Sequence, residues 1–207
     1  MSQSILLVEG KDDEHVFYAL FMHFRVPQAF KIKDKNGISN LLDTLDVELL
    51  ASDRKHLGIV VDADADLAAR WQSLTTILRK AGYTKVPSSP DPAGTILDKP
   101  AQPLPKVGIW IMPDNILPGM LEDFVSFLVP LNDPLWDKAS SCLNSLPESE
   151  KRFSHIHYAK AHIHTWLAWQ EDPGTPLGLA ITKKYLDAGS PQAQKFIAWI
   201  NRLFDSP

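Results

Sequence analysis

Cysteine and long apolar runs are almost absent from this sequence of 207 residues. Cys142 is its only cysteine, which excludes a disulfide within the chain and is typical of a reducing compartment. No stretch of about 18 apolar residues and no signal-peptide pattern occurs. We therefore expect a cytoplasmic protein that does not contact a membrane.

The sequence also has no excess of basic residues and lacks several familiar catalytic motifs. Its formal net charge is −4, which argues against strong nucleic-acid binding by the whole surface but is compatible with local contacts or with help from a partner chain. There is no Walker A motif and no Gly-x-Ser-x-Gly motif. Four histidines are expected on one helix, but no two of them have the four-residue spacing of a helical zinc site, so we interpret them as solvated or structural: His155, His157, His162 and His164.

Short apolar runs alternate with segments of helical periodicity. The pattern predicts strands at 5–8, 30–33, 58–62 and 107–112, with helices near 12–24, 38–49, 67–78 and 120–128. Such alternation is typical of an α/β fold with a mostly parallel, Rossmann-like sheet flanked by helices. We expect this domain to span residues 1–130, and residues 131–207 to form a helical carboxy-terminal extension packed on the same core. A segment with six prolines, residues 87–105, is predicted to be a long surface loop or an insertion over the carboxyl edge of the sheet.

Acidic residues follow two of the predicted strands. Glu9 ends the first apolar run, and Asp62 and Asp64 end the third. Ligands of open α/β sheets bind at the carboxyl edge, where these three side chains would meet. Carboxylates in close proximity repel one another and are best tolerated around hard divalent cations. The sequence therefore predicts a Mg²⁺ site, which Mn²⁺ could also fill. An EF-hand is excluded, because Leu67 stands where its glycine is required.

Other residues near these strand ends are expected in supporting roles. Gly10 would allow a sharp turn or a close approach to a ligand. Asp13 fits helix capping better than metal binding. Lys11, Asp66 and Asp114 lie beside the strand ends and complete the supporting set.

Lys160 interrupts an apolar stripe of 3-4-3-4 spacing in a predicted helix. Two explanations are open. Its methylene stem could lie along apolar surface while the ammonium reaches water. Alternatively, Lys160 could point towards the acidic edge and neutralise charge there.

The motifs carry a family resemblance. Val8-Glu9-Gly10-Lys11-Asp12-Asp13, followed by Val60-Val61-Asp62-Ala63-Asp64, resembles the Toprim domain of topoisomerases, bacterial primases and overcoming-lysogenisation-defect (OLD) nucleases. Leu121-Glu122-Asp123-Phe124 is similar to the helix-borne glutamate segment of OLD-type nucleases, and Lys160 is the best match for their late lysine. The resemblance covers residues 1–130. The whole chain most resembles small stand-alone bacterial Toprim-related proteins without an established activity.

This resemblance implies Mg²⁺-dependent chemistry on phosphodiesters. Glu9, Asp62, Asp64 and Glu122 would hold one or two ions, Glu9 could instead act as general acid or base, and Lys160 would be catalytic. Hydrolytic cleavage of DNA or RNA is the simplest activity. One alternative is a non-catalytic module that binds metal and nucleotide and works with a partner such as an ATPase. A receiver-like phosphoacceptor domain is a minor alternative, because Met112-Pro113-Asp114-Asn115 lacks the expected lysine. The sequence does not determine the oligomeric state.

Overall fold

The structure is a computed structural model that describes residues 3–100 and 104–204. In this described part, five strands form one sheet in the order β2-β1-β3-β5-β4. Four strands are parallel: β1 (Ser4–Val8), β2 (Lys31–Asp34), β3 (His56–Asp62) and β5 (Lys106–Met112). The short β4 (Thr95–Leu97) pairs with β5 in the antiparallel direction. The predicted α/β class with a mostly parallel sheet is confirmed.

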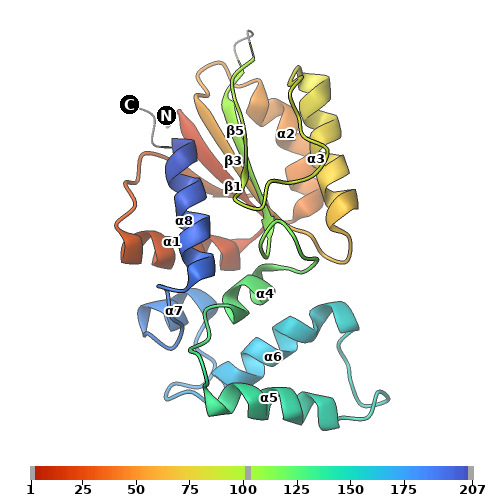
Figure 1. The fold of residues 1–207 in the computed structure, drawn as a ribbon, viewed down its shortest axis with the longest axis vertical. Helices are drawn as coiled ribbons and strands as arrows, with labels where there is room; N and C mark the ends of the chain where they lie inside the picture. The colour runs from red at the N-terminus through yellow and green to blue at the C-terminus, as the bar shows by residue number, and fades with distance from the viewer. Residues whose placement is uncertain (1–2, 101–103, 205–207) are drawn as a thin grey trace.

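Helices cover both faces of the sheet (Figure 1). On one face lie α1 (Lys11–Phe24) and α8 (Pro191–Phe204), and on the other lie α2 (Ile38–Leu49) and α3 (Leu67–Ala81). Successive strand residues point to opposite faces. Leu6 of β1 thus joins the core beneath α1 and α8, while Leu7 joins the core beneath α2 and α3. Burial on both faces explains why the strands are continuous apolar runs.

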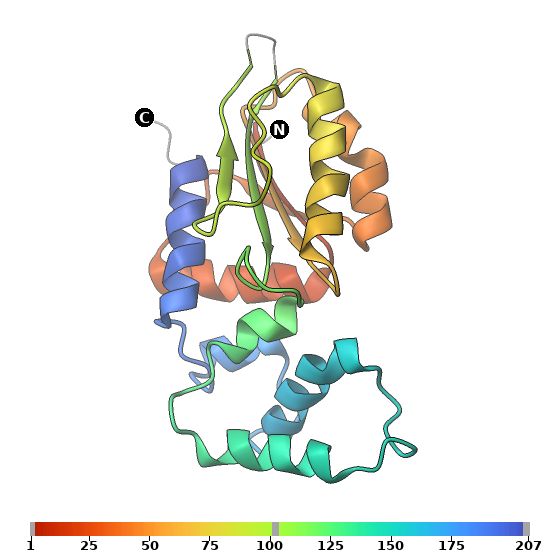
Figure 2. The same cartoon turned by 45° about the vertical axis from the view of Figure 1, so that its right-hand side comes forward.

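The remaining helices gather beyond the carboxyl ends of the parallel strands (Figures 1 and 2). They are α4 (Leu121–Ser126), α5 (Pro134–Ser145), the 3₁₀ turn η1 (His155–His157), α6 (Tyr158–Leu167) and α7 (Leu177–Thr182). The chain then returns to the sheet through α8. A β-carbon on Gly108 of β5 would lie 2.5 Å from Leu203 Cδ2, so glycine permits this close packing of α8. The division of the chain at residue 130 stays a prediction.

Two expectations about loops were wrong. The proline-rich segment 87–105 contains the edge strand β4, which fits between Pro92 and Pro100. Residues 101–103 of this segment lie outside the described residues, and no described residue of it lines the main cavity described below. The sequence Pro173-Gly174-Thr175-Pro176-Leu177-Gly178, with two prolines and two glycines, also predicts a loop. That loop ends earlier, because α7 begins at Leu177 directly after Pro176, and a proline is well tolerated at a helix start.

The length and composition of a helix decide whether it could cross a membrane. Within residues 3–100 and 104–204, none of the helices combines the length and the apolar character that crossing a bilayer requires.

Candidate metal-binding site at the carboxyl edge

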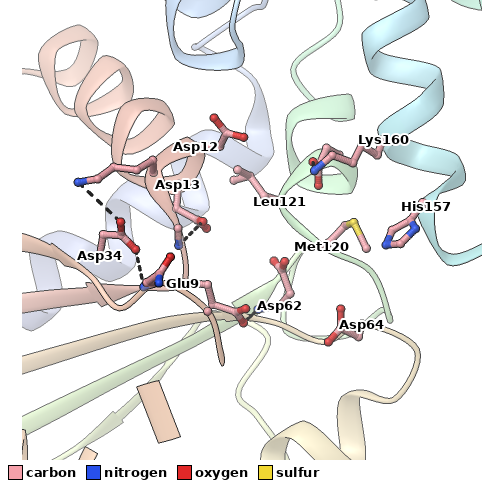
Figure 3. A pocket seen from close by; sticks show the side chains of 15 residues that line it. Glu9, Asp12, Asp13, Asp34, Asp62, Asp64, Met120, Leu121, His157 and Lys160 are labelled. Atoms are coloured by element: carbon pink, nitrogen blue, oxygen red, sulfur yellow. Dashed lines mark hydrogen bonds and ion pairs between the residues drawn. The ribbon is translucent and has the colours of Figure 1, made fainter. Parts of the chain in front are cut away.

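A cavity of about 540 Å³ opens between the carboxyl edge of the sheet and the helices beyond it. Glu9, Asp62 and Asp64 line it from the ends of β1 and β3, whereas Glu122 and Lys160 line it from α4 and α6. Figure 3 shows the labelled strand-end carboxylates on one side of the hollow and Lys160 with His157 on the other. The structure thus brings together acids that are more than a hundred residues apart in the sequence.

Glu9 connects the two sequence motifs directly. Its Oε1 accepts a hydrogen bond of 2.8 Å from the backbone N–H of Asp62. Burial raises the pKa of Glu9, and the Asp62 amide and the positive charge of Arg70 only partly offset that rise. A carboxyl group whose pKa is raised above its ordinary value is suited to proton transfer.

Asp62 has the least satisfied side chain of the cluster. Its Oδ1 is buried and has no hydrogen-bond partner among the described residues. Burial raises the pKa of Asp62 well above its ordinary value, and the charges of Asp13, Glu9 and Glu122 raise it further. Unpaired buried carboxylate oxygens are rare in proteins, and hard cations such as Mg²⁺ take oxygen ligands of this kind. The donor set therefore fits a divalent cation chemically.

Asp64 is held by the loop that follows β5. Its backbone has a left-handed φ of 54°, and its N–H and C=O form hydrogen bonds of 2.9 and 2.8 Å with Gly119. Gly119 has a φ of 140°, and a β-carbon there would lie 2.8 Å from Asp123 Oδ2. A residue other than glycine would disturb this turn in both conformation and space.

Glu122 and Lys160 form an ion pair on the helical side of the cavity. Glu122 is only 4% exposed, and its Oε1 lies 2.7 Å from Lys160 Nζ. The hydrogen bond to Glu122 raises the pKa of Lys160. Of the two explanations for the lysine in the apolar stripe, the structure favours the one in which its ammonium points towards the acidic edge, although the side chain remains half exposed.

Residues 10–13 mainly shape the start of α1. The Asp13 carboxylate accepts a 3.1 Å hydrogen bond from the Gly10 N–H, which agrees with the capping interpretation. Gly10 itself is extended, with φ −147°, a conformation open to any residue, so the sharp turn does not occur and the close approach to a ligand stays a prediction. Lys11 lies at the rim and pairs with Glu14 at 2.7 Å and with Asp34 at 3.6 Å.

Two acids expected in supporting roles do not line the cavity. Asp66 caps α3 by accepting a 2.9 Å hydrogen bond from the Ala69 N–H. Asp114 accepts hydrogen bonds of 2.9 and 2.8 Å from the N–H groups of Ile116 and Leu117. Both carboxylates are used within their own turns, which is a common role for aspartate at such positions.

As they stand, no three acidic, histidine or cysteine side chains within the described ranges are grouped to hold a metal ion. The contacts above give the physical reason. Glu9 bonds to a backbone amide, Asp64 to Arg70, and Glu122 to Lys160, so each directs an oxygen towards a protein donor. Binding of a cation would require rotation of at least some of these side chains.

The family comparison matches nearly the whole chain. A family model described as "Protein of unknown function (DUF3226)" matches residues 3–205. The chain belongs to this family. Neither the curated proteins nor the solved structures include a match.

Among the residues in or beside the cavity of this DUF3226 chain, the sequence reasoning missed three with charged or ionisable side chains. Arg70 donates hydrogen bonds to Asp64 and to the Asp62 carbonyl, Asp34 lies beside Lys11, and His157 lines the cavity from η1. A usable signal existed only for Arg70, which is a basic residue in the first turn of the helix after the Asp-x-Asp motif.

The expectation of four histidines on one helix was wrong. Two of them precede α6 in the 3₁₀ turn, while His162 is buried and its ring nitrogen Nε2 lies 3.0 Å from the Trp136 carbonyl oxygen.

Proposed function

We propose that the protein is a Mg²⁺-dependent, Toprim-type nuclease that hydrolyses phosphodiester bonds in DNA or RNA. The observation that carries the proposal is the buried, unpartnered Oδ1 of Asp62, a residue that lines an open cavity together with Glu9, Asp64 and Glu122. Mg²⁺ is the expected ion, and Mn²⁺ a workable substitute. The lone cysteine fits a cytoplasmic location, where nucleic acid is available.

The proposed reaction uses these residues in two roles, binding of the cation and transfer of a proton. Asp62, Asp64 and Glu122 would hold the cation, which when bound would stabilise charge on the phosphate and activate water. Glu9 has the raised pKa that suits a proton acceptor or donor and is positioned by the Asp62 amide. Lys160 lies at the opposite wall, where a phosphate could replace Glu122 as the partner of its ammonium group.

A matched pair of variants tests this proposal. Supercoiled plasmid, single-stranded DNA and structured RNA are incubated with wild type, Asp62→Asn and Asp66→Asn in EDTA, Mg²⁺ or Mn²⁺. Both changes remove one negative charge from the same short acidic motif, but Asp66 caps α3 outside the cavity and asparagine is also a good cap. We expect cleavage that requires metal, falls by at least about 10²-fold in Asp62→Asn, and persists in Asp66→Asn. Cleavage in EDTA, or equal cleavage by both variants, would refute the proposal.

A second candidate is a non-catalytic module that binds metal and nucleotide beside a partner such as an ATPase. It is favoured by one observation, which is that two cations beside the carboxylates, Arg70 and Lys160, are already paired with Asp64 and Glu122. Absence of cleavage with every metal, together with Mg²⁺ binding that Asp62→Asn abolishes, would favour this candidate.

A further inference from the structure

Arg70 occupies a fixed position between the two aspartates of the Asp-x-Asp motif. Its Nε donates a 2.7 Å hydrogen bond to the Asp62 carbonyl oxygen, and its Nη2 donates one of 2.6 Å to Asp64 Oδ2. The arginine side chain is only 13% exposed. Because α3 begins at Leu67, directly after its cap, Arg70 lies in the first helical turn and reaches back to the end of β3. Two bonds from one rigid guanidinium group define its orientation as well as its distance.

The guanidinium of Arg70 is a permanent cation bonded to Asp64, the aspartate that a second metal ion would need as a ligand. Arginine stays charged at all ordinary pH values. In a two-metal site the ions are about 3.5–4 Å apart, and each needs its own carboxylate oxygens. Asp64 Oδ2 is already bonded to Arg70, whereas the buried Oδ1 of Asp62 has no hydrogen-bond partner among the described residues. The two aspartates of the motif thus differ, because one is bonded to a cation and the other has a buried oxygen without a partner.

We propose that Arg70 takes the place of a second metal ion, so that the site binds one divalent cation, centred on Asp62, while Asp64 Oδ2 stays bonded to Arg70 and only the other Asp64 oxygen can reach that cation. This inference depends on the metal site of the proposed function but not on the nuclease reaction. Arg70 is then a positioning residue that acts through Asp64. Its removal would free an aspartate and add one negative charge, which are the conditions for binding a second ion.

The number of bound ions tests the inference without any activity assay. Mn²⁺ is titrated into the metal-free protein, and bound ions are counted by calorimetry and by the loss of the free Mn²⁺ signal in electron paramagnetic resonance. We expect one ion for wild type and two for Arg70→Gln. Arg79→Gln is the matched control, because Arg79 lies on the same helix but contacts the Thr75 hydroxyl and lines a different hollow. The Arg79→Gln variant should bind one ion.

Two further variants separate the proposed role from a merely structural one. Arg70→Gln/Asp64→Asn removes the freed ligand and should return the count to one, and Arg70→Lys keeps the positive charge and should also bind one. Two ions in wild type, or one ion with unchanged affinity in Arg70→Gln, would overturn the inference. No bound ion in wild type would overturn both this inference and the metal site of the proposed function. One bound ion in wild type and two in Arg70→Gln, without cleavage of any nucleic acid, would support the inference and refute only the nuclease.

Discussion

Asp13 offers a direct test of the electrostatics of the cavity. Burial raises the pKa of Asp13 to about 7 from its ordinary value of 3.8, and the charge of Glu9 adds to the rise, although the Gly10 N–H lowers it. Asp13→Asn removes the charge while an amide oxygen can still accept the bond from Gly10. We therefore expect this variant to be more stable than wild type in the absence of metal.

The size and the pH dependence of the gain follow from the two pKa values. Between about pH 4 and pH 7 the folded protein holds a proton on Asp13 that the unfolded chain has lost, so wild-type stability falls as pH rises. Each pKa unit corresponds to about 1.36 kcal/mol, which gives a ceiling of about 4 kcal/mol above pH 7. The advantage of Asp13→Asn should thus be close to zero near pH 4 and reach a few kcal/mol near pH 8.

Urea unfolding in EDTA at a series of pH values measures this advantage. Asp12→Asn is the matched control, because Asp12 is the preceding residue of the same helical turn but is exposed. Its effect should stay within about 0.5 kcal/mol at every pH. Added Mg²⁺ should reduce the advantage of Asp13→Asn, since a bound cation offsets the repulsion. A gain that does not change with pH, or one that Asp12→Asn reproduces, would refute the reasoning.

Three other variants probe the scaffold and the ion pairs. Gly119→Ala should destabilise the fold by about 2–3 kcal/mol in chemical unfolding, because both φ and the contact with Asp123 oppose a β-carbon; Gly174→Ala, with φ 80° and no atom within 4 Å, should cost only about 1 kcal/mol. Lys160→Met should cost about 1–3 kcal/mol by leaving the buried Glu122 carboxylate unpaired, and a loss below about 0.5 kcal/mol would show that the pair contributes little. Asp62→Asn should raise the melting temperature of the metal-free protein and abolish any increase caused by Mg²⁺ in a thermal shift assay; a Mg²⁺ effect equal to that of wild type would place the cation elsewhere.

Much of the sheet could be predicted from local pattern. Ile5-Leu6-Leu7-Val8 and Ile59-Val60-Val61 are continuous apolar runs because both faces of their strands are covered, and such runs are visible without any tertiary information. The short β4 was missed because its three residues lie among prolines, and its pairing with β5 is a long-range contact. Helix α7 was missed for a related reason. Pro173 and Pro176 are typical of a loop, and the packing of α7 against α1 is a tertiary contact that the local sequence does not show.

The sequence by itself determined that Glu9, Asp62 and Asp64 meet at one edge, because parallel strands place their carboxyl ends together. Only the tertiary structure decided how each acid is used. Asp66 looks like its neighbours in the sequence but caps a helix, and Arg70 gains its role by reaching back from α3 to the end of β3. Burial, charge and hydrogen bonding depend on segments that are distant along the chain, so the unpartnered oxygen of Asp62 could not be predicted from the spacing of acidic residues.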